Sequence, residues 1–156
     1  MFCMYIIKSL DYISINDAIK LTLEVFMEFE APEYSDEGIK TFTDYVTSDE
    51  TRQIFLNSSN IFLGCYYKKQ LVGIIAFRDD SHVSLLFVDK NHHRKGIATR
   101  LMKKAVKITK KKGVREITLN SSPYAVPFYH RFGFVDTDTQ LLTDGIKYTP
   151  MKYIIK

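Results

Sequence analysis

The sequence is poor in cysteine and in clustered metal-ligating side chains. Only Cys3 and Cys65 are present, and each lies in an apolar run typical of a strand, so we expect no disulfide framework. Reduced thiols of this kind fit a cytoplasmic protein. The adjacent pair His92 and His93 has no cysteine or carboxylate partner at ligand spacing, so we predict no metal site.

The chain also lacks a long apolar run. No stretch approaches the roughly 20 residues that are needed to cross a bilayer. Residues 1–7 are apolar, but they are too few for the core of a signal peptide, and no basic segment precedes them. There is no internal repeat, low-complexity tract or interdomain linker. The sequence therefore predicts no membrane partner and a single domain over residues 1–156.

The composition that remains is that of an ordinary globular protein. Hydrophobic residues make up 46% of the chain and charged residues 26%, which argues against intrinsic disorder. The net charge of +4 is unevenly spread, with carboxylates concentrated in the first quarter and basic residues concentrated between Arg94 and Lys112. Two interpretations stay open: the two regions face ligands of opposite charge, or both are solvated helix faces.

Helical periodicity dominates the first third of the chain. After a strand over residues 4–8, a helix is expected to begin at Ser14, where Asp17 completes a capping pattern three residues later. Pro32 ends that helix. A second helix is expected to begin at Ser35, with acidic residues in its first turn.

The period then changes to that of strands. Apolar and aromatic runs predict strands over residues 61–68, 71–78, 82–88, 114–119, 134–135 and 146–155. The first two would be joined by a turn at Lys69-Gln70. A long helix precedes residue 114 and a shorter one spans residues 125–132, so the order is β-α-α-β-β-β-α-β-α-β-β. This order predicts an α/β fold with a mixed, mostly antiparallel sheet and one parallel crossover, with helices on both faces.

A strand end, a basic loop and a helix start follow one another between Val88 and Leu101. Such a turn leaves the first amides of the helix unpaired and directed at one place. The helix dipole, Arg94 and Lys95 add positive potential there. The stretch therefore predicts an anion site, for which phosphate is the obvious ligand.

Two blocks resemble motifs of the GNAT (GCN5-related N-acetyltransferase) superfamily. Residues 93–98 (His-Arg-Lys-Gly-Ile-Ala) are similar to its acetyl-CoA signature, Gln/Arg-x-x-Gly-x-Gly/Ala. Residues 128–134 (Phe-Tyr-His-Arg-Phe-Gly-Phe) resemble its Phe-Tyr-x-x-x-Gly-Phe block. The order of elements is also that of the family, so the resemblance covers nearly the whole chain and implies a three-layer α-β-α fold with a splayed parallel pair. His93 departs from the usual Gln or Arg.

The resemblance implies acetyl-CoA as the donor. The pyrophosphate would lie on the amides of the loop 93–99, and the pantetheine would hydrogen-bond to the exposed strand edge at residues 86–88. Asn120 matches a position that often contacts the pantetheine. The predicted cofactor-binding residues are Leu86, Phe87, Val88, His93, Arg94, Lys95, Gly96, Ile97, Ala98, Thr99, Asn120 and Phe128.

Tyr129 matches the family's tyrosine near the thioester sulfur. Attack by an amine produces a tetrahedral oxyanion and then a thiolate, which needs a proton. With a reference pKa of about 10, Tyr129 would be protonated at neutral pH and able to supply that proton. The alternative is a helix tyrosine that only packs against the sheet.

An ammonium group must also lose a proton before it can attack, so a base is required. His82 is the first candidate, because histone and serotonin acetyltransferases carry an acidic residue or histidine six positions before the residue that Val88 matches. The two-residue strand period would place its side chain on one face with Ser84, Leu86 and Val88. An exposed histidine after a turn is an equally good interpretation.

The acidic residues around the end of the first helix are rivals of His82. Their simplest role is to attract a cationic amine, so the predicted acceptor-binding residues are Glu28, Glu30 and Glu33. The predicted reaction is transfer of acetyl from acetyl-CoA to the primary amine of a small, cationic acceptor. A peptide or protein amine, another acyl-CoA, and a CoA-binding regulator without turnover stay open.

Nucleic-acid binding by the lysine-rich stretch 103–112 is a further class. The long helix needs its apolar stripe for the core, and the lysines can form a solvated face, so no nucleic-acid partner is predicted. Pairing of strands at the C-terminal end leaves a homodimer open.

Overall fold

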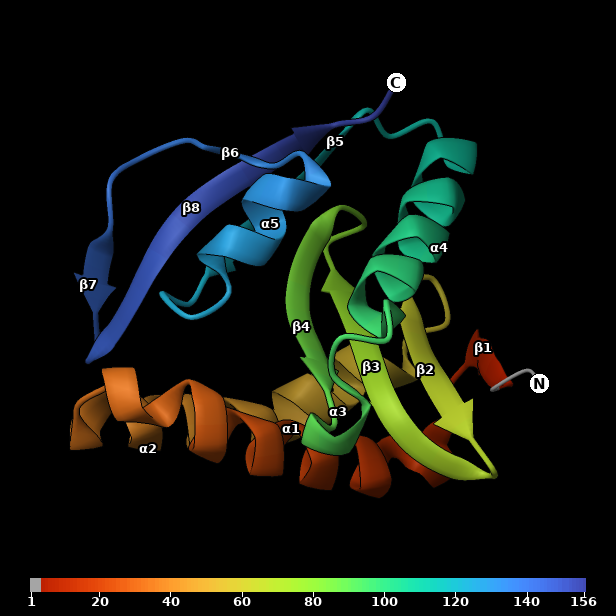
Figure 1. Ribbon diagram of the computed structural model, residues 1–156, viewed down its shortest axis with the longest axis horizontal. Coiled ribbons are helices and arrows are strands. Elements are labelled where there is room, and N and C mark those ends of the chain that lie inside the picture. Colours follow the sequence, from red (N-terminus) through yellow and green to blue (C-terminus); the bar gives the residue numbers. More distant parts are fainter. Residues whose placement is uncertain (1–3) are drawn as a thin grey trace.

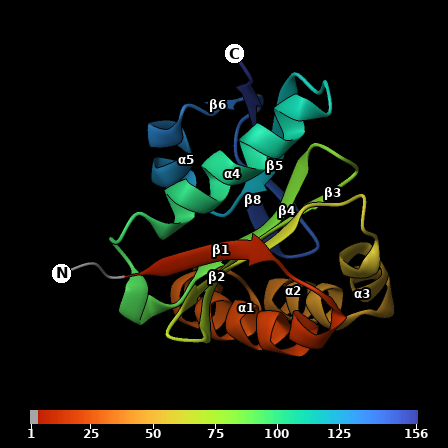
Figure 2. The ribbon, with the colours of Figure 1, turned by 90° about the vertical axis from the view of Figure 1, so that its right-hand side faces the viewer.

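The computed structural model describes residues 4–156, which form an eight-stranded sheet between two layers of helices (Figures 1 and 2). The strand order is β1-β2-β3-β4-β5-β8-β6, with β7 paired to β8. All pairs are antiparallel except β4 with β5. The strands are β1 (Tyr5–Ser9), β2 (Phe62–Tyr67), β3 (Gln70–Arg78), β4 (His82–Val88), β5 (Glu116–Ser121), β6 (Val135–Asp136), β7 (Leu141–Thr143) and β8 (Ile146–Ile154).

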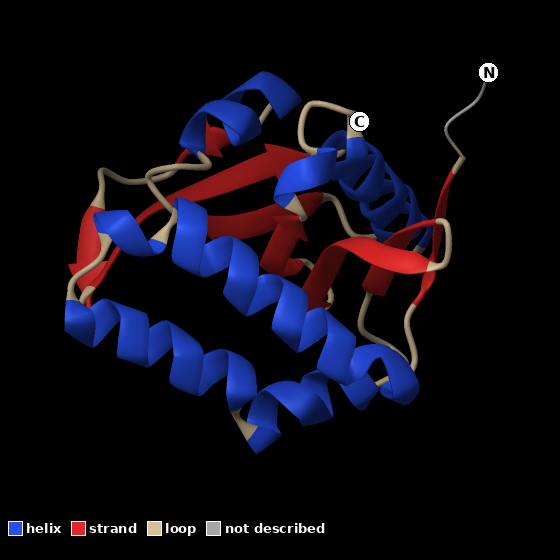
Figure 3. Ribbon diagram, turned by 60° about the horizontal axis from the view of Figure 1, so that its bottom comes forward, coloured by secondary structure: helices blue, strands red, loops and turns tan. Residues whose placement is uncertain are grey.

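The helices lie on both sides of this sheet, as Figures 2 and 3 show. One face carries α1 (Ile15–Phe29), α2 (Asp36–Thr47) and α3 (Asp49–Leu56), and the other carries α4 (Ile97–Lys111) and α5 (Val126–Phe132). Short 3-10 turns are η1 (Tyr12–Ser14), η2 (Ala31–Glu33) and η3 (Lys90–His92). We call the two sides the α1 face and the α4 face. The predicted α/β fold with three layers is confirmed.

Each face has its own hydrophobic core. On the α4 face, Leu101 and Met102 of α4 pack against Val72 and Ile75 of β3. On the α1 face, the core includes Phe26 together with aromatic side chains from α2 and β4. Among residues 4–156, no helix is long and apolar enough to span a membrane. Cys65 is a buried free thiol in β2, whereas Cys3 lies outside the described residues.

The start of α1 differs from the capping pattern in the sequence. The helix begins at Ile15, but the Ser14 side chain caps no amide, so the predicted capping box is wrong. Asp11 instead accepts from Ile13 and caps the preceding 3-10 turn. At α2 the expected cap is present, because Ser35 accepts from the amide of Gly38.

The first hairpin turn is shifted by one residue from its predicted place. Lys68 and Lys69, with φ of 49° and 67°, form the turn, and Gln70 already pairs in β3. A two-residue hairpin that matches the strand twist needs positive φ at both central positions, and here the register forces lysines into them. Farther along, β5 begins at Glu116 rather than at 114, and the missed strand β7 pairs with β8.

A bulge in β4 overturns the predicted alternation along this strand. Leu85 pairs with Ala76 and Val83 with Phe77, which leaves Ser84 as an extra residue. Val83 consequently packs in the α4-face core, whereas Leu85 packs in the α1-face core. His82 and Leu86 therefore lie on opposite faces, and the expectation that His82, Ser84, Leu86 and Val88 share one face is wrong.

Candidate active site

The parallel strands β4 and β5 separate almost as soon as they meet. Only His82↔Thr118 and Val83↔Leu119 pair between them. Beyond these pairs β5 stays with β8, and Figure 1 shows α5 lying beside the opening. Residues 84–88 of β4 thus have no strand partner on the β5 side, which leaves polar backbone groups available along that edge.

Two cavities occupy this opening. The smaller cavity, of about 550 Å³, is lined by α2, the start of β4 and the β7–β8 hairpin. The larger cavity, of about 940 Å³, is lined by the loop 92–99, α4 and α5. The residues that line both cavities mark the junction between them; they are Glu30, Leu86, Phe87, Ala125 and Tyr129.

The predicted cofactor-binding residues gather around the larger cavity. All of them line it except Lys95 and Asn120. Asn120 lines the smaller cavity instead. It belongs to the end of β5, which continues to Ser121 beyond the last pair with β4 at Leu119. The stretch of loop and helix recognised in the sequence is therefore assembled on one side of the sheet.

The loop before α4 forms an open cradle of main-chain donors. Gly96 precedes α4 with φ of 76°, and nothing lies within 4 Å of the position that a Cβ would take. No side chain caps α4, and its first turn contains no acidic residue. The backbone amide of Arg100 donates to the Gly96 carbonyl oxygen. The amides that precede Arg100 in the first turn have no carbonyl acceptor within the helix. The arrangement suits an anion.

His93 fastens this loop to the sheet. Its Nε2 donates to the Val88 carbonyl oxygen across 2.7 Å. The imidazole ring also packs against Phe29 at the end of α1, with ring centroids 4.9 Å apart. The residue that departs from the family signature thus links the loop, β4 and α1, and the cradle itself is built of backbone.

Glu30 and Tyr129 lie at the junction of the cavities. Glu30 follows the last residue of α1, where the helix dipole is negative, and it makes no ion pair within the described part of the chain. Burial raises the pKa of Glu30 to about 7, and Ser122 moderates the rise. The pKa values of Tyr129 and Tyr34 are raised above the usual tyrosine value. Burial is the larger cause, and the negative charge of Glu30 is the smaller one.

His82 lines only the smaller cavity and lies outside the junction. Its Nδ1 is 2.8 Å from Oγ1 of Thr118 on β5. Burial and the nearby Arg78 lower the pKa of His82 to about 4, against a smaller opposing effect of Asp79. His82 is therefore uncharged at neutral pH and is a weak base.

The three acidic residues predicted to bind the acceptor are separated by the fold. Of the three, only Glu30 lines either of the two cavities at the opening. Glu28 forms a surface ion pair with Lys90, 3.4 Å away, and Glu33 is exposed in η2. No group of three or more metal-ligating side chains occurs among residues 4–156.

The family model described as acetyltransferase (GNAT) domain matches residues 30–155, which is most of the chain. The chain belongs to the GNAT family of acetyltransferases. A curated relative, the uncharacterized N-acetyltransferase YafP of Escherichia coli (strain K12), is 37% identical over 65 residues. That match covers 42% of this chain and 39% of the relative, so it spans well under half of each.

Solved GNAT structures share the whole fold. The PaiA N-acetyltransferase of Thermoplasma acidophilum, solved in complex with coenzyme A, superimposes with a TM-score of 0.81 at 23% identity and covers 97% of this chain and 99% of its own. A GCN5-related N-acetyltransferase from Rhodopseudomonas palustris gives a TM-score of 0.84 at 16% identity, covering 99% and 98%. The splayed β4–β5 pair thus belongs to a GNAT fold.

Within this GNAT domain, sequence reasoning missed several cavity residues. Tyr34, Arg78 and Ser122 all line the smaller cavity. A signal for Arg78 exists, because it is a charged residue in alternation with the buried Ile74 and Ala76 on an otherwise apolar strand face. Tyr34 and Ser122 lie in connecting segments, where no helical or strand periodicity indicates which way a side chain points.

Proposed function

We propose that this GNAT domain transfers acetyl from acetyl-CoA to the primary amine of a small acceptor. The observation that carries the proposal is the junction, where a basic, amide-lined cavity meets a second cavity at Glu30 and Tyr129. Acetyl-CoA, when bound, supplies the activated acetyl group as a thioester. The chain's own residues must bind it, remove a proton from the amine and protonate the leaving sulfur.

The larger cavity fits the donor. Its cradle at Gly96 offers unpaired amides and open space, and Arg94 lies in the same loop, as a pyrophosphate requires. The β4 edge at residues 86–88 offers backbone groups to an extended arm, although the Val88 carbonyl is already bonded to His93. Lys95 and Asn120 have no place in this proposed donor site.

We assign the base to Glu30 in preference to His82. Glu30 lies at the junction beside Tyr129, it has no cationic partner among residues 4–156, and its pKa of about 7 suits proton transfer at neutral pH. His82 is hydrogen-bonded to Thr118, lies away from the junction, and has a pKa of about 4. An ammonium entering the smaller cavity would find an uncompensated negative charge at Glu30.

Tyr129 completes the reaction as the acid. Glu30 takes a proton from the ammonium, the nitrogen–carbon bond forms, and the carbon–sulfur bond breaks. The Tyr129 hydroxyl gives a proton to the departing thiolate, the nitrogen of the new amide gives its second proton to the phenolate and so restores the phenol, and Glu30 releases the proton it holds to solvent. The raised pKa of Tyr129 keeps its proton in place before the step.

The direct test uses the purified chain, acetyl-CoA and a panel of small amines, with release of the CoA thiol as the readout. We expect saturable binding of acetyl-CoA by calorimetry and amine-dependent thiol release. Binding without release by any small amine or peptide amine would favour the regulatory alternative. One domain over residues 1–156 and a cytoplasmic location stay predictions alongside this proposal, and the oligomeric state stays open.

A further inference from the structure

The smaller cavity carries a positive charge that the proposed reaction does not use. Besides Glu30, its charged lining residues are Arg78 and Asp144, since His82 is neutral. Arg78 is the last residue of β3 and pairs across the sheet with His82. Because Ala76 belongs to the α1-face core, the strand period places the Arg78 side chain on that same face, beneath α2.

The guanidinium of Arg78 has unused donors. Its Nε is buried and has no hydrogen-bond partner within the described residues. The ion pairs of residues 4–156 involve Lys40, Lys90, His130 and Lys152, and none involves Arg78. Burying a charged donor without a partner is costly, so a group of this kind is typically satisfied by a ligand or a counter-ion.

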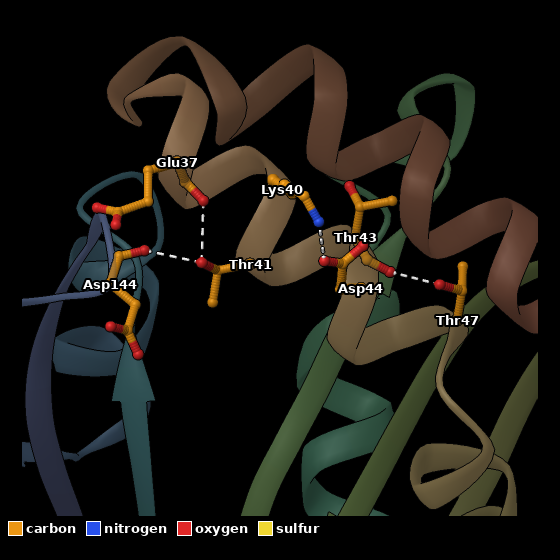
Figure 4. Close-up of polar contacts among 7 residues, drawn as sticks. All are labelled: Glu37, Lys40, Thr41, Thr43, Asp44, Thr47 and Asp144. Carbon is orange, nitrogen blue, oxygen red and sulfur yellow. Dashed lines mark hydrogen bonds and ion pairs between the residues drawn. The ribbon is translucent and has the colours of Figure 1, made fainter.

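Neither the carboxylate next to Arg78 in the sequence nor the other carboxylate that lines only this cavity meets this need. Asp79 follows Arg78 directly, but with φ of 52° it already belongs to the turn after β3. Asp144 lies at the tip of the β7–β8 hairpin, exposed, and its backbone carbonyl accepts from the Thr41 hydroxyl of α2 (Figure 4). Within the described part of the chain neither forms an ion pair with Arg78, so the cavity offers a free cationic group.

Glu30 and Arg78 also lie in different parts of the two cavities. Glu30 lies at the junction with the larger cavity, whereas Arg78 lines only the smaller cavity. A molecule that placed a cationic amine at Glu30 would therefore extend toward Arg78. An acceptor with positive charge at both ends would meet repulsion there, and one with a negative far end would be attracted.

We propose that Arg78 binds a carboxylate of the acceptor, so that the acceptor is a small amino-carboxylate rather than a polycation. The inference rests on the proposed function. It replaces the cationic acceptor expected from Glu28, Glu30 and Glu33, of which only Glu30 reaches the cavity. A planar guanidinium matches the two oxygens of a carboxylate, and a single arginine balances a single negative charge.

A matched ligand series tests this assignment on the unchanged chain. The series consists of ω-amino acids with two to six carbons, their primary amides, and diamines of equal length. Thiol release gives kcat and KM for each, and calorimetry in the presence of CoA gives affinity without turnover. We expect the best amino acid to have a KM at least about tenfold below that of its amide, with the diamine weaker still.

Variants of Arg78 locate the effect. In Arg78→Gln the preference for the carboxylate over the amide should fall to within about twofold, with kcat for the amide little changed. Arg78→Lys should keep part of the preference, because lysine keeps the positive charge but lacks the planar set of N–H donors that matches a carboxylate. Arg52→Gln is the matched control, since Arg52 of α3 makes an exposed hydrogen bond to Asn16 and lies outside both cavities.

The outcomes separate the two proposals. Equal affinity for amino acid, amide and diamine, or an undiminished preference in Arg78→Gln, overturns the role of Arg78. Tighter binding of aminoalkyl phosphates than of amino acids overturns the carboxylate. Bound acetyl-CoA with no thiol release overturns the proposed function, while the calorimetric preference still decides the role of Arg78. Should Arg78→Gln fail to fold, the preference measured in Arg78→Lys and in wild type decides it instead.

Discussion

The two cavities on either side of the β4–β5 opening are built in different ways. The larger cavity contains one continuous stretch, the loop before α4 and the first turn of this helix, whose main-chain donors form the cradle, and residues of α1, β4, α5 and β8 complete its lining. The smaller cavity is lined by side chains from α2, β3, β4, β5 and β8. A short motif can specify the cradle of the larger cavity, whereas the smaller cavity exists only after the whole sheet has formed.

Changing Tyr129 should affect the chemical step most, because this residue lies where the two cavities meet. We expect Tyr129→Phe to lower kcat by about 100-fold or more, since the departing thiolate loses its proton donor. The KM for acetyl-CoA should change little, because the cradle is intact. Unchanged turnover with saturable donor binding would remove Tyr129 from the mechanism and leave it a packing residue.

Gly96→Ala should affect only the larger cavity. Gly96 has φ of 76°, which an alanine adopts with strain, although no neighbour blocks the added methyl. We expect the dissociation constant of acetyl-CoA to rise by about tenfold, with the acceptor KM within twofold of wild type. Gly113→Ala is a matched control, because Gly113 also has positive φ and open surroundings but lies at the far end of α4.

Gly38→Ala should affect only the smaller cavity. A Cβ on Gly38 would collide with the carbonyl of Gly145, so α2 and the β7–β8 tip must move apart near the Thr41–Asp144 contact (Figure 4). We expect the acceptor KM to rise by severalfold and the melting temperature to fall by several degrees. An equal loss of acetyl-CoA affinity would contradict the division between the cavities.

Glu30→Gln should reveal a smaller effect, on stability. The pKa of Glu30 rises from 4.5 to about 7 on folding, so the folded state holds the proton more tightly, and wild-type stability falls as pH rises from 4.5 through 7. The variant should therefore be more stable than wild type by about 1–3 kcal/mol at pH 8, with the gain fading toward pH 5. Denaturant unfolding at both pH values measures this, and an equal difference at both would contradict the raised pKa.

The same contrast explains what the sequence could predict. The stretch from Val88 to Leu101 was interpreted correctly as strand, basic loop and helix, because its signals are local. The bulge at Ser84 leaves no local signal, so the phase of His82 relative to Leu86 was wrong. Arg78 was missed because its importance depends on an opening that forms when β4 and β5 splay apart.

The acidic residues teach a similar point. Glu28, Glu30 and Glu33 looked equivalent in the sequence, yet η2 begins immediately after Glu30 and directs the chain so that only this carboxylate is at the junction. Its distinction is environmental: burial and the lack of an ion-pair partner among residues 4–156, neither of which a residue pattern encodes.

The proposed mechanism depends above all on Glu30 acting as the base at the junction. The direct measurement is the pH dependence of kcat/KM for one amine in wild type, Glu30→Gln and His82→Ala. We expect a rising limb near pH 7 in wild type and in His82→Ala, following the pKa of Glu30, and loss of this limb in Glu30→Gln with a rate lower by about 100-fold. A limb near pH 7 that survives in Glu30→Gln, or one that disappears in His82→Ala, would contradict this role of Glu30.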